Sequence, residues 1–266
     1  MLQSEAGIRL AAFVSIFAAM ALLELAAPRL NRREMAGAVK ARRWFVNLAM
    51  VVLSSVVLRI VFPAAAVGAA LWAEANGYGF FRMASVDPLV AGVIAFVALD
   101  FAVWLEHVAS HKIPLLWRIH RMHHSDTGFD LTTALRFHPL EILLSMIWKA
   151  AIVVLLGAPV LCVLLFEIVL NGCAMFNHAN LRLPGALDRA LRLIIVTPDM
   201  HRVHHSSTPA ETDSNYGFNF SFWDRLFGVY TPRPAKGHDA MEIGLREYRD
   251  DGPTHLGWAL LLPFRR

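Results

Sequence analysis

Charged residues are scarce in this 266-residue chain: Asp, Glu, Lys and Arg make up 17% of it, against roughly 25% in a typical soluble domain. Hydrophobic residues make up 56%, and the mean hydropathy is +0.48. Such a composition excludes intrinsic disorder, which requires low hydrophobicity and high charge. It also offers too few charges for the surface of a soluble globule of this size, so it indicates a membrane protein.

Cysteine is nearly absent as well. Cys162 and Cys173 lie in one apolar run, and eleven residues along a helix place them roughly 16 Å apart, too far for a disulfide. No disulfide framework and no CxxC motif exist, which is typical of a protein in a reducing compartment. The chain also lacks a GxGxxG fingerprint, a P-loop and a haem motif. We therefore expect no nicotinamide, flavin or iron–sulfur domain of its own.

Four or five apolar runs are long enough to enter a bilayer, for which a helix needs roughly 20 residues. They cover residues 8–27, 44–71, 86–105, 140–156 and 159–176. Arg59 and Pro63 interrupt the second run, and the last two form a hairpin that either spans the membrane or dips in and returns. The expected fold is an all-α membrane bundle with a helical cap. We expect N-terminal membrane segments over 1–85, a catalytic domain over 86–230, and a C-terminal tail over 231–266 that lies in the membrane interface.

The net charge of +4 reflects membrane topology rather than nucleic-acid binding, because the basic residues cluster at the ends of apolar runs. The connection after the first run is rich in them, whereas residues 72–85 hold only Arg82. The six in the first connection are Arg29, Arg32, Arg33, Lys40, Arg42 and Arg43. This asymmetry predicts that the first connection is cytoplasmic, and alternation then brings the histidine-rich segments to the same side. The expected location is a bacterial inner membrane.

Histidine is the residue the chain has in excess: ten of its 12 histidines lie between His107 and His205. An HxxHH motif occurs at 120–124 and again at 201–205, and on a helix its three imidazoles can face one point. His107 and His111 share a helix face with Asp100, two turns earlier.

These three clusters supply eight imidazoles, more than one tetrahedral ion can use. The pattern therefore predicts two metal ions with four to five nitrogen ligands each, although imidazole does not choose between Zn, Fe, Cu and Ni. Neither HExxH nor the ExxH pairs of soluble di-iron proteins occur. Three alternatives stay open at this point: a zinc-dependent membrane hydrolase, a metal transporter or sensor, and a cluster that senses pH.

The motifs resemble those of the fatty acid hydroxylase superfamily, also called the sterol desaturase family. The resemblance covers about residues 90–230 and rests on the order HxxxH, HxxHH, HxxHH together with the residues around it. These are LLWRIHRMHHS at 115–125, LTTALRFHPLE at 131–141, NHAN at 177–180, TPDMHRVHHS at 197–206, NYG at 215–217 and WDRLFG at 223–228.

The resemblance implies a non-haem di-iron centre that uses O₂ to hydroxylate or desaturate a C–H bond of a lipid, with zinc able to replace iron in purified protein. Catalysis would need no residue beyond the metal centre. The implied ligands are His107, His111, His120, His123, His124, His178, His201, His204 and His205. His138 is either a tenth ligand or a residue that orients one. Asp100, Asn180, Asp199 and Asp224 are candidates for holding ligands or a water in place.

Electrons would come from a separate donor of the ferredoxin or cytochrome type. Arg118, Arg121, Arg136 and Arg202 could form its docking surface. Alternatively, these arginines meet lipid phosphates or pair with Asp126, Asp130 and Asp199. His238 and His255 lie outside the motifs and are expected at the surface.

Overall fold

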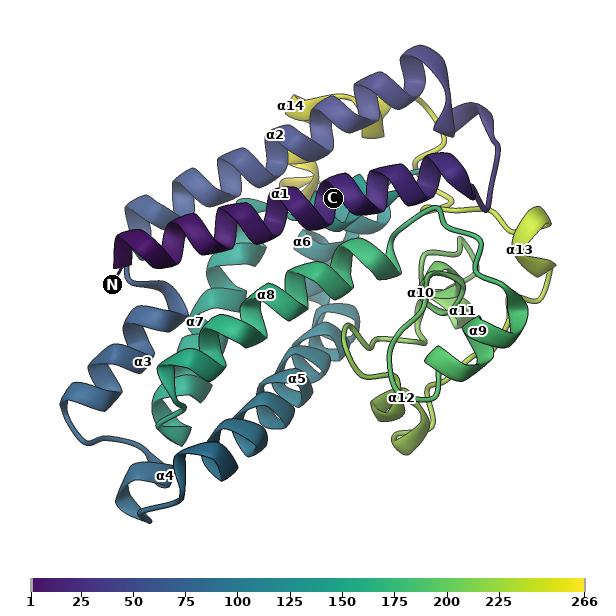
Figure 1. Cartoon of the computed structure of the whole chain (residues 1–266). Coiled ribbons are helices and arrows are strands. Elements are labelled where there is room, and N and C mark those ends of the chain that lie inside the picture. The colour runs from purple at the N-terminus through teal and green to yellow at the C-terminus, as the bar shows by residue number, and fades with distance from the viewer. Residues whose placement is uncertain (1, 266) are drawn as a thin grey trace.

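The computed structural model describes residues 2–265, and they form an all-helical protein whose only strand-like pairings are three isolated bridges (Figure 1). The all-α prediction is therefore confirmed. Five helices are long: α1 (Leu2–Ala26), α2 (Gly37–Val61), α5 (Pro88–Lys112), α7 (Pro139–Leu156) and α8 (Val160–Asn177). The shorter helices are α3 (Ala65–Ala75), α4 (Phe80–Met83), α6 (Pro114–His124), α9 (Gly185–Leu191), α10 (Pro198–His204), α11 (Pro209–Thr212), α12 (Phe222–Leu226), α13 (Gly237–Ala240) and α14 (Leu256–Leu261). Four 3₁₀ turns complete the described residues: η1 (Arg33–Met35), η2 (Leu131–Leu135), η3 (Gly252–Thr254) and η4 (Leu262–Phe264).

Five segments are long and apolar enough to cross a membrane: Glu5–Ala26, Gly37–Met83, Pro88–Lys112, Pro139–Leu156 and Val160–Asn177. The second segment is bent, because Pro63 cannot continue a helix and separates α2 from α3. α7 and α8 each have 18 residues, about 27 Å at 1.5 Å per residue. The turn between them contains Gly157 at φ +66, a left-handed conformation that glycine adopts without strain.

The interior of the bundle is apolar and so is its outer surface. Phe166, Leu99, Val153 and Val163 belong to a core formed by α3, α5, α7 and α8. Large apolar side chains also point outward from the long helices, among them Leu25, Ile60, Val93 and Leu161. So many exposed apolar side chains on long helices fit contact with lipid rather than water.

One end of the bundle carries a cap built from the chain around α9–α13 (Figure 1). Aromatic side chains fix it to α5: the ring of Trp104 stacks on that of Phe227, with centroids 4.6 Å apart, and Phe101 lies against Trp223. The C-terminal α14 packs on α2 through a small cluster that includes Ala259 and Met50. The interfacial position of this tail and the boundaries at residues 85 and 230 stay predictions.

Candidate metal centre

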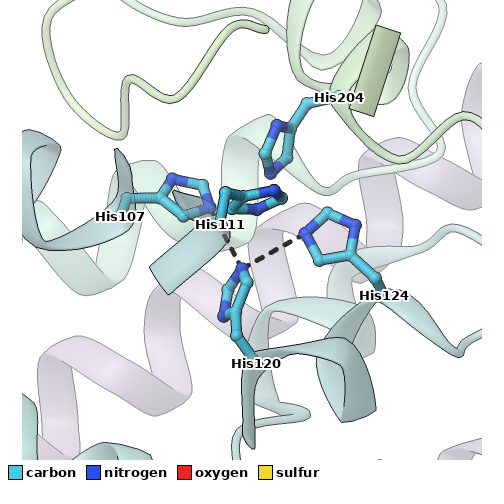
Figure 2. A group of neighbouring side chains, drawn as sticks. All are labelled: His107, His111, His120, His124 and His204. Carbon is cyan, nitrogen blue, oxygen red and sulfur yellow. Dashed lines mark hydrogen bonds between the residues drawn. The ribbon is translucent and has the colours of Figure 1, made fainter. Parts of the chain in front are cut away.

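Nine histidines from four parts of the chain meet where the bundle and the cap join. Their ring nitrogens form two groups, and within each group the potential ligand atoms lie within 4.8 Å of one another. The first group contains His107, His111, His120, His124 and His204 (Figure 2). The second group contains His123, His178, His201 and His205. Each group alone has enough nitrogen atoms to bind one metal ion.

The two HxxHH motifs are divided between the groups, which corrects the expectation that each motif faces a single point. His120 and His124 join the first group, whereas His123 of the same motif joins the second. The second motif shows the opposite division: His204 alone belongs to the first group. The reason is helical geometry, since residues four apart share a face while the residue beside them is rotated away from it.

Breaks in the helices bring the ligand-bearing segments together. α5 ends at Lys112, and Pro114 occupies the first turn of α6, so the chain changes direction between His111 and His120. His178 is the C-cap of α8, and the second motif lies on the short α10 with His205 just after its end. All nine side chains therefore lie at one end of the bundle.

Backbone carbonyl oxygens hold several imidazoles in one tautomer. Nδ1 of His107 donates to the carbonyl of Tyr216 at 2.7 Å, and Nδ1 of His204 donates to that of Ser214 at 2.7 Å. Nδ1 of His178 donates in the same way to the carbonyl of Ala174, also at 2.7 Å. Because a carbonyl can only accept, the proton is on Nδ1 and the Nε2 atom of each ring carries a lone pair.

Glu141, near the start of α7, does the same for His120. Its Oε1 accepts from Nδ1 of His120 at 2.6 Å, and this contact keeps the proton on Nδ1 so that Nε2 faces the group. Sequence reasoning did not assign Glu141 a role, although it ends the LTTALRFHPLE segment. The missed signal is that Glu141 lies in the segment that resembles the family, on the first turn of a mostly apolar helix.

These tautomers leave unshared lone pairs facing one another in both groups. Nε2 of His107 lies 3.2 Å from Nε2 of His120, the contact drawn as a dashed line in Figure 2. Nε2 of His178 lies 3.2 Å from Nε2 of His123 in the second group. Nε2 of His204 is buried and has no hydrogen-bond partner within the described residues. Converging unprotonated nitrogens repel each other unless a cation lies between them, so both groups fit bound metal ions.

Burial keeps six of the rings neutral, the form that binds metal. Loss of solvent lowers the pKa of His204 to about 3 and that of His178 to about 4. The pKa values of His123, His124, His201 and His205 are lowered for the same reason, and the neighbouring imidazoles lower them further. At neutral pH no proton competes with a metal ion for these nitrogens.

Four residues were expected to hold the ligands in place, and they act through other residues instead of hydrogen bonding to the histidines. They are Asp100, Asn180, Asp199 and Asp224. Asp224 accepts from the backbone N–H of Tyr216 at 2.9 Å and from Nε1 of Trp104 at 2.9 Å, which positions the carbonyl that binds His107. Asp100 accepts from Nε1 of Trp223 at 2.8 Å. Within the described chain, none of the four hydrogen bonds to a histidine of either group.

The other two of these residues tie segments together. Asn180 pairs through both side-chain atoms with the backbone of Leu30, at 2.8 Å each. Asp199 pairs with Arg202 and with Arg29. Both contacts connect the second motif and its surroundings to the loop after α1.

The remaining histidines lie outside both groups. His138 caps α7, where its Nδ1 accepts from the N–H of Leu140 at 3.2 Å. His255 is exposed, as expected. His238 is half-buried and lies 3.6 Å from Asp199, so the expectation of an ordinary surface residue is wrong for it.

The proposed basic docking surface is also corrected. Arg136 and Arg202 are completely buried, because both serve as hydrogen-bond donors inside the protein. Arg136 donates to the carbonyl of Met122 at 3.0 Å, and Arg202 pairs with Asp199, as the alternative interpretation expected. Of the four arginines, only Arg118 and Arg121 are outside the buried interior.

A different buried arginine holds the loop after the first HxxHH motif. Arg43 of α2 forms ion pairs with Asp126 at 2.5 Å and with Asp130 at 3.0 Å. A Cβ at Gly128 would lie 2.2 Å from Cζ of Arg43, so only glycine allows this approach. Arg43 was interpreted from sequence as a topology signal, but the structure shows that it also fixes the metal-site loop.

A cavity of about 190 Å³ opens beside the first group of histidines. His107 and His120 form part of its wall. Much of the rest is apolar and comes from α1, α2, η2, α5, α7, α8 and the cap, including Phe13, Val51, Val103, Leu135, Leu170 and Phe218. A volume of this size among apolar helices fits a segment of a hydrocarbon chain.

The chain belongs to the fatty acid hydroxylase family, whose model matches residues 92–229. A similar protein is the ornithine lipid hydroxylase of Rhizobium tropici, 34% identical over 146 residues, which cover 54% of this chain and 43% of that protein. The alkylglycerol monooxygenase of Danio rerio is 33% identical to this chain over 145 residues, which cover 54% of this chain and 31% of that protein. The match to a cholesterol 25-hydroxylase-like protein of Danio rerio is 31% identical and covers 49% of this chain and 51% of that protein. The chain thus spans less than half of the first two relatives, and no solved structure matches it significantly.

Proposed function

We propose that this protein is a membrane-bound oxidoreductase that hydroxylates a C–H bond of a lipid at a centre of two iron ions. The observation that carries the proposal is the position of the two histidine groups, at the end of an apolar bundle and beside an apolar cavity. The names of the relatives, a lipid hydroxylase and a monooxygenase, support the same reaction class. Desaturation of the same bond stays the alternative outcome.

The nine histidines of the two groups would hold the metal, and His138 is left out of the proposed ligand set because it caps α7. When bound there, iron would supply the O₂-dependent oxidation of the C–H bond. The residues of this chain position the reaction. The cavity places an alkyl chain next to His107 and His120 and excludes water, while Glu141 and the carbonyls of Tyr216 and Ser214 hold protons on Nδ1.

Hydroxylation by O₂ consumes two electrons and two protons and releases one water, so a reductant is required. We propose an external donor of the ferredoxin or cytochrome type, because the sequence has no nicotinamide, flavin or iron–sulfur motif. We place the site on the cytoplasmic side. The basic first connection supports this orientation, although Arg29 and Arg43 within it also pair with acidic residues of the cap end.

The test is purification with iron, followed by lipid mass spectrometry with and without O₂ and a reductant. We expect close to two iron ions per chain and a product heavier by one oxygen that requires both O₂ and reductant. A variant with His201, His204 and His205 all changed to Ala is the matched control and should give neither. Turnover without O₂ would favour the zinc hydrolase, and metal flux across vesicles without lipid oxidation would favour the transporter.

A further inference from the structure

The cavity beside the first histidine group has a polar wall that the proposed oxidation does not use. Glu106, Ser145, Lys149 and Asn171 line it together with the apolar side chains. All four come from helices with the length and composition of membrane spans. Ionisable side chains at such positions are costly and usually mark a functional site.

Three of these residues form a contiguous surface. Oγ of Ser145 donates to Oε2 of Glu106 at 3.1 Å. Ser145 and Lys149 are four residues apart on α7, so they lie on the same face of that helix. The cavity therefore presents a carboxylate and an ammonium side by side.

Lys149 has unused hydrogen-bonding capacity. Its nearest carboxylate oxygen is Oε1 of Glu167, at 3.9 Å, which is too far for a hydrogen bond. Within the part of the chain that the structure describes, its Nζ donates to no other group. An ammonium has three donors, so a group that enters the cavity can accept at least one of them.

The charges around the cavity disfavour an anionic ligand. Glu167 forms an ion pair with Arg9 of α1, and Arg9 also pairs with Glu5 at 2.6 Å. Together with Glu106, the nearby carboxylates outnumber the two cations. A carboxylate or phosphate added here would be left without full neutralisation in a low-dielectric surrounding.

We propose that this polar wall, Glu106–Ser145–Lys149, binds a hydroxyl group of the substrate, so that the substrate is a lipid alcohol rather than a plain hydrocarbon chain or a fatty acid. A hydroxyl both accepts and donates, so it can accept from Lys149 and donate to Glu106. This inference rests on the proposed function in one respect only: it calls the bound alcohol a substrate.

The wall extends along α7 away from the first histidine group. Lys149 is eight residues beyond Glu141, which contacts His120, and this corresponds to about 12 Å along α7 at 1.5 Å per residue. Lys149 is thus the end of the wall farther from Glu141, whereas Glu106 directly precedes His107 in α5.

Binding is the first readout. The zinc-loaded full-length protein in detergent is titrated with radiolabelled hexadecanol, hexadecane and palmitate under identical micelle conditions. We expect hexadecanol to bind about tenfold more tightly than hexadecane, the difference that one hydrogen bond to a charged group provides, and palmitate to gain no such advantage. Lys149→Met keeps the length of the side chain and should reduce this preference to less than about twofold.

Matched variants keep the test decisive. Lys149→Arg retains the charge and the donors and should keep most of the preference, while Ile147→Met, on the exposed side of α7, should leave it unchanged. If Lys149→Met does not fold, Ser145→Ala replaces it and should reduce the preference in the same direction. Equal binding of hexadecanol and hexadecane by the wild type, or tighter binding of palmitate, overturns the proposal.

The second readout separates this inference from the proposed function. Iron-loaded protein is given O₂, reductant and hexadecanol, and the position of new oxygen is determined by mass spectrometry. A preference for the alcohol without any oxygenated product supports the polar wall and contradicts the proposed function. An oxygenated product formed with no preference for the alcohol supports the function and overturns the inference.

Discussion

Nε2 of His123, from the first HxxHH motif, lies 3.2 Å from Nε2 of His205, from the second. The neighbours of His123 in its own motif belong to the other group. Each proposed metal site is therefore assembled from both motifs, and neither motif forms a site by itself. This interlocking makes the two sites depend on the same pair of segments.

Metal stoichiometry should follow the groups and not the motifs. A double variant within the first group, His111→Ala with His204→Ala, should retain about one metal ion per chain because the second group is intact. The double variant His123→Ala with His205→Ala removes one histidine from each motif but takes both from the second group, so it should also retain about one ion, held by the intact first group. Elemental analysis of the purified proteins measures this, and His255→Ala is the exposed control. Loss of both ions by the His123→Ala, His205→Ala variant would show that each motif forms its own site.

Glu141→Gln should weaken the first site without removing it. The change keeps the size of the side chain but replaces the carboxylate that accepts from Nδ1 of His120. Loss of such a partner typically reduces metal affinity by about 10- to 100-fold. Competition with a chelator should show one of the two ions leaving more easily, while the other leaves as in the wild type. Unchanged release of both ions would mean that Glu141 does not support the ligand.

The metal-free protein should lose stability as the pH falls. Burial lowers the pKa of His178 from 6.5 to about 4 and that of His204 to about 3. Below pH 6.5 the unfolded chain binds protons that these native rings do not, so each ring costs about 1.4 kcal/mol of stability per pH unit until its native pKa is reached. Thermal unfolding in chelator between pH 7.5 and pH 5 measures the slope. His178→Asn should make the slope shallower, whereas an equal slope in this variant would contradict the assignment.

Arg43→Met should destabilise the protein strongly. It leaves Asp126 and Asp130 buried without their cation, and breaking a buried ion pair on one side costs about 3–5 kcal/mol. Thermal unfolding in detergent should show a marked decrease in Tm, accompanied by weaker metal binding, because the loop after His124 is no longer held. The adjacent Arg42 is exposed, so Arg42→Met provides the control. Equal Tm values for the two variants would rule out this role for Arg43.

Much of the fold could be predicted from the sequence because its signals are local. The apolar runs gave helices long enough to cross a membrane, and Pro63 divided the second run as expected. The nine histidines were selected by spacing and by resemblance, and the structure brings all nine together. The predicted docking surface was wrong at Arg136 and Arg202, because the sequence alone does not show that these two side chains are buried.

The sequence by itself determined that the chain is a helical membrane protein with eight histidines spaced to bind metal, because hydropathy and helical spacing are properties of neighbouring residues, and the family resemblance added His178. Only the tertiary structure decided how these histidines divide into two groups, which partners hold them and which side chains line the cavity. Glu141 meets His120, the carbonyl of Tyr216 meets His107, and Lys149 lies within 3.9 Å of Glu167. Each of these contacts joins segments that are distant in sequence, and packing of the helices alone sets the distance between them.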